Sequence, residues 1–398
     1  MRYEPPMTKN RTSRPGAPKR PGRPASPDSG PGHREPRRPG RRDGAEAERA
    51  EHRAAPKRPE PNERVRAAPE EAERPRLSTD ELGREGRRDR PAVEWPEGAR
   101  PAFRAPVILT VEPGADYALL DSGDGEKLER YGPLTIRRPE NQAIWPRRTD
   151  AADWDGADAI FTGDTDEEGT GRWRFPREAL GETWPMRQDG LAYLGRFTSF
   201  RHVGVFPEQA VHWRFMTDLI EGAGRPVRVL NLFGYTGLAS LLAARAGAEV
   251  THVDASKRAI GWARENAEIA GVADKPIRWI CEDAVRYAER EVKRGATYDI
   301  ILLDPPKFGR GPKGEVWQIF EDLPYLLMLM RKLLSANPLA LVLTAYSIRS
   351  SFYSLSALMG EQCRGLGGAV ESGELVIREA GEDARLLSTS LFSRWVSA

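Results

Sequence analysis

Hydrophobic and polar positions switch between strand-like and helix-like spacing along the second half of the chain. The spacing predicts a buried strand at 227–232 and a helix at 238–246, which ends before Gly247. The pattern then repeats, with helices predicted at 257–270, 283–293 and 320–334 and strands at 250–254, 277–281, 298–303, 339–344, 374–378 and 388–395. The last two strands flank a turn at 381–383 and are expected to form a hairpin. The predicted fold is therefore α/β, a Rossmann-like sheet of seven strands with helices on both faces.

The chain before residue 198 shows two other patterns. Residues 1 to about 100 are rich in Pro, Arg, Gly and Glu and have almost no apolar periodicity, so they cannot bury enough surface to fold. Short apolar runs with Gly and Asp turns then predict strands at 107–111, 117–120, 134–137, 159–161 and 173–175. We predict a disordered tail at 1–104, a small β-rich accessory domain at 105–197 and the α/β domain at 198–398.

Charge and rare residues restrict the class of protein. The first 100 residues contain 25 Lys and Arg against 18 Asp and Glu, and the remainder contains 36 against 41. The basic tail, densest at 34–42, is either a solvated low-complexity segment or a phosphate-binding one. Two cysteines, Cys281 and Cys363, cannot form a disulfide framework or a zinc site, and the five histidines show no metal-ligand spacing. No apolar run approaches the roughly 18 residues of a membrane span. We expect a cytoplasmic protein without metal.

Four features lie at the carboxyl ends of predicted strands, where α/β sheets bind ligands. A loop with glycines at Gly234 and Gly237 follows the first strand and lets a ligand approach the backbone. Asp254 ends the second strand, where a carboxylate can accept the hydroxyls of a ribose. Asp283 follows the third strand and suits an adenine amino group or, alternatively, caps the next helix. Asp304 opens an Asp-Pro-Pro-Lys-Phe segment after the fourth strand, whose two prolines fix the backbone.

Residues 200–398 resemble the class I S-adenosylmethionine-dependent methyltransferases, above all the bacterial ribosomal RNA large-subunit methyltransferase family with an Asp-Pro-Pro-x-Phe signature. The resemblance lies in 229–233, 235–237, 252–256, Asn266 and 304–308. More loosely, 204–209 resembles the segment that leads into the family's cofactor pocket. It implies S-adenosylmethionine as cofactor. The residues that it implies for cofactor binding are Phe206, Asn231, Phe233, Gly234, Tyr235, Gly237, Asp254, Ser256 and Asp283.

The residues after the predicted fifth strand indicate how the methyl group is transferred. Family members that methylate a pyrimidine carbon use a cysteine after the fifth strand, where this chain reads Thr-Ala-Tyr-Ser at 344–347. Cys281 lies inside a predicted strand and is interpreted as a small core residue. Without a thiol, direct in-line transfer to a nitrogen or oxygen is expected. By resemblance, Asp304 and Pro305 hold the acceptor amine and Phe308 stacks on its ring.

The predicted acceptor is RNA, most directly ribosomal RNA, methylated at a base nitrogen. A Gly-rich loop at 309–314 and its neighbour carry Lys307, Arg310 and Lys313, which suit phosphate contacts as well as they suit solvated surface charge. The accessory domain is expected to help grip the acceptor. Two alternatives stay open: a methyltransferase for a protein or small molecule, and a noncatalytic RNA-binding protein on the same fold. The sequence does not specify the target nucleotide or the oligomeric state.

Overall fold

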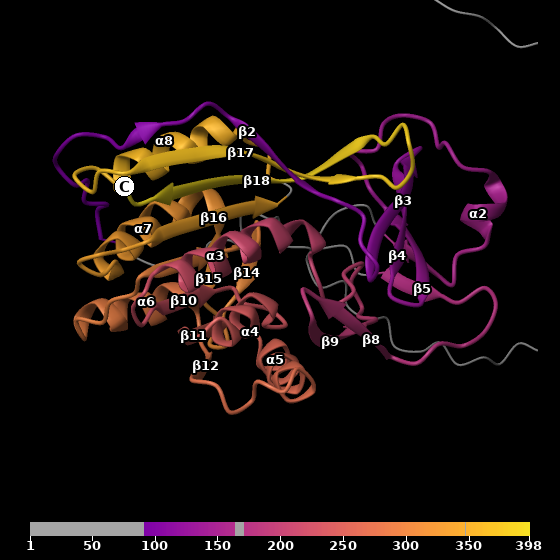
Figure 1. Cartoon of the computed structure of the whole chain (residues 1–398), viewed down its shortest axis with the longest axis horizontal. Coiled ribbons are helices and arrows are strands. Elements are labelled where there is room, and N and C mark those ends of the chain that lie inside the picture. The colour runs from indigo at the N-terminus through magenta and orange to yellow at the C-terminus, as the bar shows by residue number, and fades with distance from the viewer. Residues whose placement is uncertain (1–90, 164–170, 347) are drawn as a thin grey trace, which may run out of the picture. The chain divides into compact units, whose positions relative to one another are not determined.

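The computed structural model describes residues 91–163, 171–346 and 348–398 (Figure 1). These residues belong to one compact unit, 74–398. The tail that the sequence predicts as disordered lies, up to residue 90, outside the described residues. None of the described helices is long and apolar enough to cross a membrane.

The main feature is a nine-stranded sheet. Its strand order is β1-β17-β18-β16-β13-β10-β11-β12, and β2 pairs with β17 on the same side as β1. Within this described sheet, only β18 runs antiparallel to its neighbours. The strands are β1 (Ala102–Phe103), β2 (Val107–Val111), β10 (Arg228–Leu232), β11 (Glu249–Asp254), β12 (Ile277–Cys281), β13 (Ile300–Leu303), β16 (Ala340–Tyr346), β17 (Ala369–Arg378) and β18 (Leu386–Val396).

Six of the described α-helices cover the two faces of this sheet, because its central strands are apolar on both sides. All four residues of β13 are buried, as expected for a parallel strand between two helical layers. Helices α3 and α4 pack into the core on one face, with α5 beside α4. Helices α6, α7 and α8 pack into the core on the other face. The helices are α3 (Ala210–Gly222), α4 (Leu238–Arg245), α5 (Lys257–Ile269), α6 (Ala284–Lys293), α7 (Ile319–Leu333) and α8 (Phe352–Gln362).

The order of the strands fixes where a ligand can bind. From β10 the chain moves outward through β11 to β12, and then returns to place β13 on the opposite side of β10. The crossover connections therefore diverge between β10 and β13, which opens a crevice at the carboxyl ends of these two strands. The predicted ligand loop and the segment that begins at Asp304 follow these two strands.

The predicted sheet of seven strands is too small, because two short strands near residue 105 join it. Strand β2 was predicted for the accessory domain but pairs in parallel with β17. Residues 102 and 103, assigned to the tail, pair with β17 as β1. The boundary predicted at residue 104 is therefore too late, since Glu94 already forms an ion pair with Lys332 of α7.

The accessory domain is built mainly on a five-stranded sheet in the order β3-β4-β5-β6-β7, next to a two-stranded hairpin, β8-β9. Its aromatic residues form much of its core, in which Trp154 and Trp184 are buried and Trp145 and Trp173 are partly buried. Its elements are β3 (Tyr117–Gly123), β4 (Glu126–Tyr131), β5 (Leu134–Pro139), α2 (Ala151–Asp155), β6 (Ala159–Gly163), β7 (Gly171–Arg174), β8 (Thr183–Gln188) and β9 (Leu191–Arg196).

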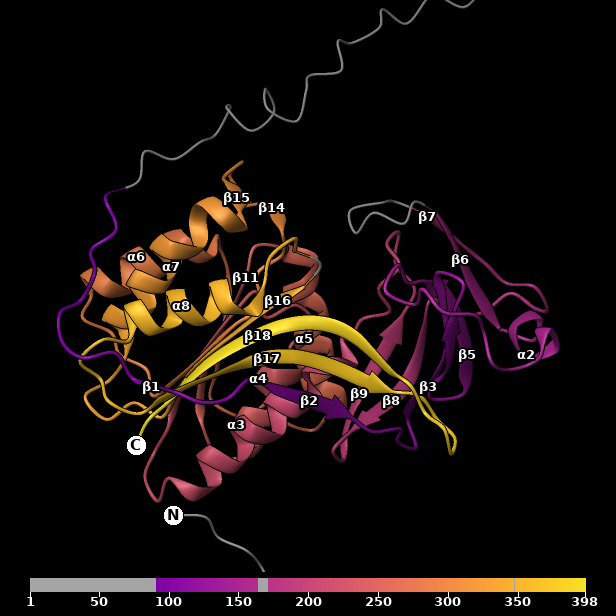
Figure 2. The same ribbon diagram turned by 90° about the horizontal axis from the view of Figure 1, so that it is seen from above.

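The hairpin of β17 and β18 extends beyond the sheet to the accessory domain at β3 (Figures 1 and 2). Near its tip, Arg385 donates a hydrogen bond of 2.6 Å to Asp121, a buried carboxylate of β3. Ser122 of β3 donates a bond of 2.5 Å to Glu379 of the hairpin. These buried, charge-assisted contacts join the accessory domain to the main sheet.

Sequence periodicity identified the repeating strands and helices of the α/β domain but missed several elements. Helices α3 and α8 and strands β4, β8 and β9 had no predicted counterpart. Two further strands, β14 (Phe308–Arg310) and β15 (Val316–Gln318), form a hairpin where a Gly-rich loop was predicted.

Candidate active site

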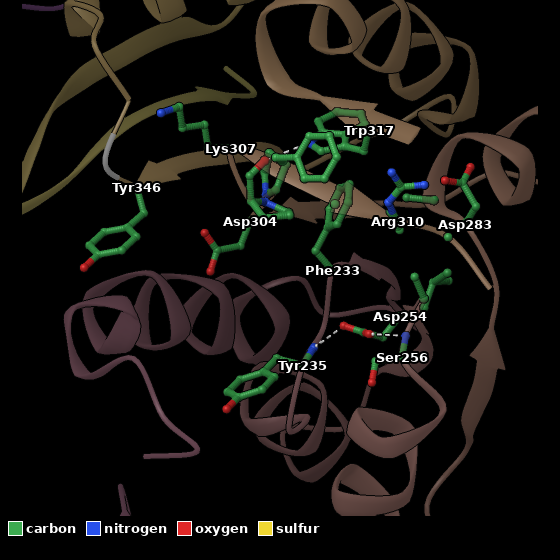
Figure 3. Close-up of a pocket in the computed structure, with 18 of the residues that line it drawn as sticks. Phe233, Tyr235, Asp254, Ser256, Asp283, Asp304, Lys307, Arg310, Trp317 and Tyr346 are labelled. Carbon is green, nitrogen blue, oxygen red and sulfur yellow. Dashed lines mark hydrogen bonds between the residues drawn. The ribbon is translucent and has the colours of Figure 1, made fainter. Parts of the chain in front are cut away.

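A cavity of about 380 Å³ lies at the carboxyl ends of the central strands. Asp304 and Tyr346 lie on one side of it, and Asp254, Ser256 and Asp283 lie on the other (Figure 3). It brings together eleven residues predicted from the sequence: Phe206, Phe233, Tyr235, Asp254, Ser256, Asp283, Asp304, Pro305, Lys307, Phe308 and Arg310. Its size is that of a pocket for a small organic ligand.

The loop after β10 has an unusual backbone. Phe233 and Tyr235 both have positive φ, at 59° and 49°, a conformation that side chains with a Cβ disfavour. Between them, Gly234 leaves no room for a side chain, because a Cβ there would lie 2.4 Å from the His252 ring. Gly237, at φ +89°, begins α4 as its N-cap. Such strain is typical of functional sites, where the surrounding fold holds the loop in place.

Asp254 connects this loop to the next helix. One of its carboxylate oxygens accepts a bond of 2.9 Å from the backbone N–H of Tyr235, and the other accepts one of 2.8 Å from the N–H of Ser256. Burial raises the pKa of Asp254, and these two backbone bonds oppose the shift. Each carboxylate oxygen has a second acceptor position, so Asp254 can still accept two hydroxyl groups from a ligand.

Four residues predicted to bind the cofactor have structural roles, and three of these four do not line this cavity. Asp283 caps α6, with an oxygen that accepts a bond of 3.0 Å from the Arg286 N–H, and it also lines the cavity. Asn231 is buried below the loop and donates to Ser240 at 2.9 Å, so it lies outside this cavity. Gly234 and Gly237 also do not line it.

Asp304 is half-buried directly after β13, and its pKa is strongly shifted. Burial, together with the neighbouring negative charge of Glu208, raises its pKa to about 7. Gln209 donates a bond of 3.2 Å to one Asp304 oxygen and accepts one of 3.2 Å from Thr344. Asp304 can therefore exist in both protonation states near neutral pH.

Several lining residues were missed by the sequence reasoning. His202, Glu208, Gln209, Trp317 and Tyr346 all line the cavity. Two of them, Glu208 and Gln209, belong to the 204–209 segment that the resemblance includes, so the signal was available. The other three carry no motif, and only the fold brings them to the site.

The predicted basic loop is an ordered β-hairpin. Strands β14 and β15 pair from Phe308 to Arg310, and Trp317 donates a bond of 2.7 Å to the Pro306 carbonyl. Lys307 and Arg310 line the cavity with exposed side chains, whereas Lys313 lies in the hairpin turn outside it. The hairpin therefore presents its cations at the edge of the cavity.

The accessory domain supports the side of the cavity on which Asp304 lies. Its buried Glu129 pairs with Arg138 at 2.6 Å, and Arg138 donates a bond of 2.9 Å to the backbone oxygen of Arg201. Arg201 in turn donates to the phenol oxygen of Tyr346, which lines the cavity. Buried charges that are paired and hydrogen-bonded in this way fix local geometry.

Neither cysteine lines the cavity. Cys363 is buried at the end of α8, but Cys281 is exposed at the end of β12, so its interpretation as a core residue is wrong. Strand β12 is an edge strand of the sheet, and its last residue is exposed. Among the described residues, no group of three His, Cys, Asp or Glu side chains could hold a metal ion.

Comparisons with known proteins agree with this geometry. Residues 165–342 match the family model described as S-adenosylmethionine-dependent methyltransferase. A crystal structure of the SAM-dependent methyltransferase from Agrobacterium tumefaciens is 61% identical, with a TM-score of 0.75, over 77% of this chain and 98% of that one. A putative methyltransferase complexed with SAH, SMU.776, is 21% identical with a TM-score of 0.53 over 71% of this chain and 76% of that one, and shows the same fold.

Curated relatives share a shorter stretch. A "Ribosomal RNA large subunit methyltransferase K/L" from Syntrophotalea carbinolica is 33% identical over 32% of this chain and 17% of that protein. One of the same name from Shewanella sp. (strain MR-4) is 32% identical over 37% of this chain and 21% of that protein. The aligned stretch is thus about a fifth of the length of these relatives.

The cavity fits the cofactor of this family. Its volume and the two remaining acceptor positions of Asp254 suit a nucleoside with ribose hydroxyls. The match over nearly the whole of the Agrobacterium tumefaciens enzyme settles the assignment. The chain therefore belongs to the S-adenosylmethionine-dependent methyltransferases, with S-adenosylmethionine as its cofactor.

Proposed function

We propose that this enzyme methylates a nitrogen atom of an RNA base, with ribosomal RNA as the substrate class. The observation that carries the proposal is the half-buried Asp304 carboxyl, whose pKa of about 7 suits a proton acceptor at neutral pH. It lies in a cavity without a cysteine. A pyrimidine ring carbon needs covalent activation by a nucleophile, whereas a nitrogen with a lone pair does not.

The cofactor is proposed to lie along the Asp254 side of the cavity. Asp254 would accept the ribose hydroxyls, Asp283 would face the adenine, and Phe233 and Tyr235 would enclose the nucleoside. Bound S-adenosylmethionine supplies an electrophilic methyl group on a positively charged sulfur.

Asp304 and Pro305 are proposed to hold the acceptor amine. The carboxylate would accept a hydrogen bond from an amine N–H, which directs the nitrogen lone pair into the cavity. A nitrogen that gains a methyl group must then lose one proton, and Asp304 can accept it because its pKa lies near neutral pH. Phe308 lines the same cavity, where it can stack on the base.

Two observations support RNA. Lys307 and Arg310 are exposed cations at the cavity, with Lys313 nearby on the same hairpin, and such side chains bind phosphate groups without reading sequence. The curated relatives are named as ribosomal RNA methyltransferases. The accessory domain, which supports Tyr346 through Arg201, is proposed to help hold the acceptor.

The test is transfer of tritiated methyl groups from S-adenosylmethionine by the full chain. Deproteinised ribosomal RNA and a nucleic-acid-free protein fraction serve as parallel acceptors, and the labelled nucleosides are identified by mass spectrometry. We expect N-methylated bases in the RNA and a loss of at least about 100-fold in Asp304→Ala. Asp274→Asn, which alters an exposed carboxylate outside the cavity, is the matched control.

The outcomes separate the alternatives. Label that resists ribonuclease but not protease would identify a protein acceptor and refute RNA. A C-methylated pyrimidine would refute the nitrogen acceptor and the role of Asp304. RNA binding without detectable transfer or affinity for S-adenosylmethionine would favour the noncatalytic alternative.

A further inference from the structure

A second, smaller cavity of about 60 Å³ adjoins the main one. We call it the inner cavity. The two cavities lie side by side, because they share five lining residues, which are Phe206, Gln209, Phe233, Tyr235 and Asp304. The inner cavity can hold a small polar group or a few water molecules.

Polar side chains around the inner cavity mostly have partners within the protein. Asn231 donates to Ser240 at 2.9 Å. Gln209 donates to Asp304 and accepts from Thr344, each at 3.2 Å. These groups therefore need no ligand to satisfy them.

His212 is the exception. It belongs to α3, is only 2% exposed and lines the inner cavity. Both of its ring nitrogens are buried and have no hydrogen-bond partner among the described residues. No other described residue that lines the inner cavity has a buried side-chain nitrogen or oxygen without a partner. Phe392 of β18 packs edge-on against the imidazole, with the ring centroids 5.1 Å apart. A buried polar group without a hydrogen-bond partner is unfavourable. An imidazole that is packed in place with both nitrogens unpartnered therefore indicates that a polar ligand or water is missing.

The chemistry of the cofactor supplies such a partner. Asp254 and Asp283 line the main cavity but not the inner one, and under the proposed function they hold the adenosyl end. The other end of S-adenosylmethionine carries an ammonium and a carboxylate group. Burial lowers the pKa of His212 to about 3, so its ring is neutral, with one nitrogen as donor and the other as acceptor. A neutral imidazole can donate to the carboxylate or accept from the ammonium.

We propose that His212 binds the amino-acid end of S-adenosylmethionine from the inner cavity and thereby determines specificity for the complete cofactor. The proposal rests on the proposed position of the adenosyl end, but it does not depend on the acceptor. Its test uses binding alone and is therefore independent of whether RNA is the substrate.

The experiment compares two ligands by calorimetry or competition with tritiated S-adenosylhomocysteine. S-adenosylhomocysteine has the amino-acid end, and 5′-methylthioadenosine has the same adenosyl thioether without it. In the full chain, His212→Phe keeps a ring against Phe392 but removes both nitrogens. We expect its Kd for S-adenosylhomocysteine to rise roughly 10- to 100-fold, the effect of one hydrogen bond to a charged group. Its Kd for 5′-methylthioadenosine should stay within about twofold of the original protein.

A further variant and the melting temperature complete the design. His212→Gln keeps a donor and an acceptor and should recover part of the lost affinity, and it carries the comparison if His212→Phe does not fold. The melting temperature of ligand-free His212→Phe should equal or exceed that of the original protein, because the substitution removes unpartnered buried nitrogens. Equal losses for both ligands would mean a distorted pocket and overturn the proposal. Unchanged affinity for S-adenosylhomocysteine would show that the imidazole serves only buried water, and would overturn it too.

Discussion

Replacing Asp304 by asparagine should stabilise the protein in a pH-dependent way. The folded-state pKa of Asp304 is raised from 3.8 to about 7, so the folded protein holds a proton here that the unfolded chain has released. Between these two pH values, the Asp304 contribution to the free energy of unfolding falls as pH rises. Above pH 7 the carboxylate is ionised in this half-buried position, and its desolvation cost is then largest. The carboxamide of the Asp304→Asn variant does not titrate, so the variant avoids this cost.

The magnitude follows from the shift. About three pKa units at roughly 1.36 kcal/mol each give an upper limit of about 4 kcal/mol. Water in a cavity that opens to solvent reduces this, and we expect a gain on the order of 2 kcal/mol at pH 8. At pH 4 Asp304 is protonated in the folded protein. The stability difference between the variant and the original protein should then reflect only the exchange of a carboxylic acid for a carboxamide. For a chain of this size the gain corresponds to a few degrees in Tm.

The assay is thermal and urea unfolding of the original protein, Asp304→Asn and the control Asp274→Asn at pH 4 to 8. The difference between the first two should grow from pH 4 to 7 and then level off, while methyl transfer falls at least about 100-fold. A difference that is constant with pH, or that shrinks as pH rises, would refute the reasoning, because Asp304 would then titrate like an exposed carboxyl.

Three further substitutions test other parts of the structure. Gly234→Ala places a Cβ 2.4 Å from the His252 ring and should cost about 1–3 kcal/mol of stability, whereas an unchanged melting temperature would contradict the close approach. Asp254→Ala removes the acceptor for the backbone N–H groups of Tyr235 and Ser256 and should weaken S-adenosylhomocysteine binding at least about 30-fold by calorimetry. Unaltered binding would exclude Asp254 from the cofactor site. Arg385→Ala leaves the buried Asp121 without its cation and should lower the free energy of unfolding in urea by roughly 3–5 kcal/mol. A decrease below about 1 kcal/mol would mean that the hairpin contact does not stabilise the accessory domain.

The sequence predicted the α/β domain well because its order is local. Each of the five parallel strands from β10 to β16 is an apolar segment near a predicted one, and the intervening helices α4 to α7 have amphipathic or apolar periodicity. Long-range pairing is different. Strand β2 reads like any short apolar run, and only its pairing with β17, more than 250 residues later, places it in the main sheet.

The candidate site was predictable to the extent that it lies in motifs. Asp254 ends a strand, Asp283 and Asp304 follow strands, and strand order brings all three to one edge of the sheet. Tyr346 lies in the cavity as well, but its position depends on Arg201, which in turn contacts the accessory domain. No local pattern indicates such a contact. The basic hairpin was predicted as a loop because its strands are only three residues long and its turn is Gly-rich.

Residues with an unfavourable backbone conformation or a shifted pKa lie at the same edge of the sheet as the candidate site. Phe233 and Tyr235 have positive φ in a loop where glycine would cost less, and Asp304 is a carboxyl group with a raised pKa in a cavity. The apolar strands and helices around them follow ordinary rules and supply the stability that these residues reduce. A folded chain retains such unfavourable features where a ligand compensates for them. By the same reasoning, the unpartnered imidazole of His212, next to this loop in the inner cavity, belongs to the ligand site and not to the core alone.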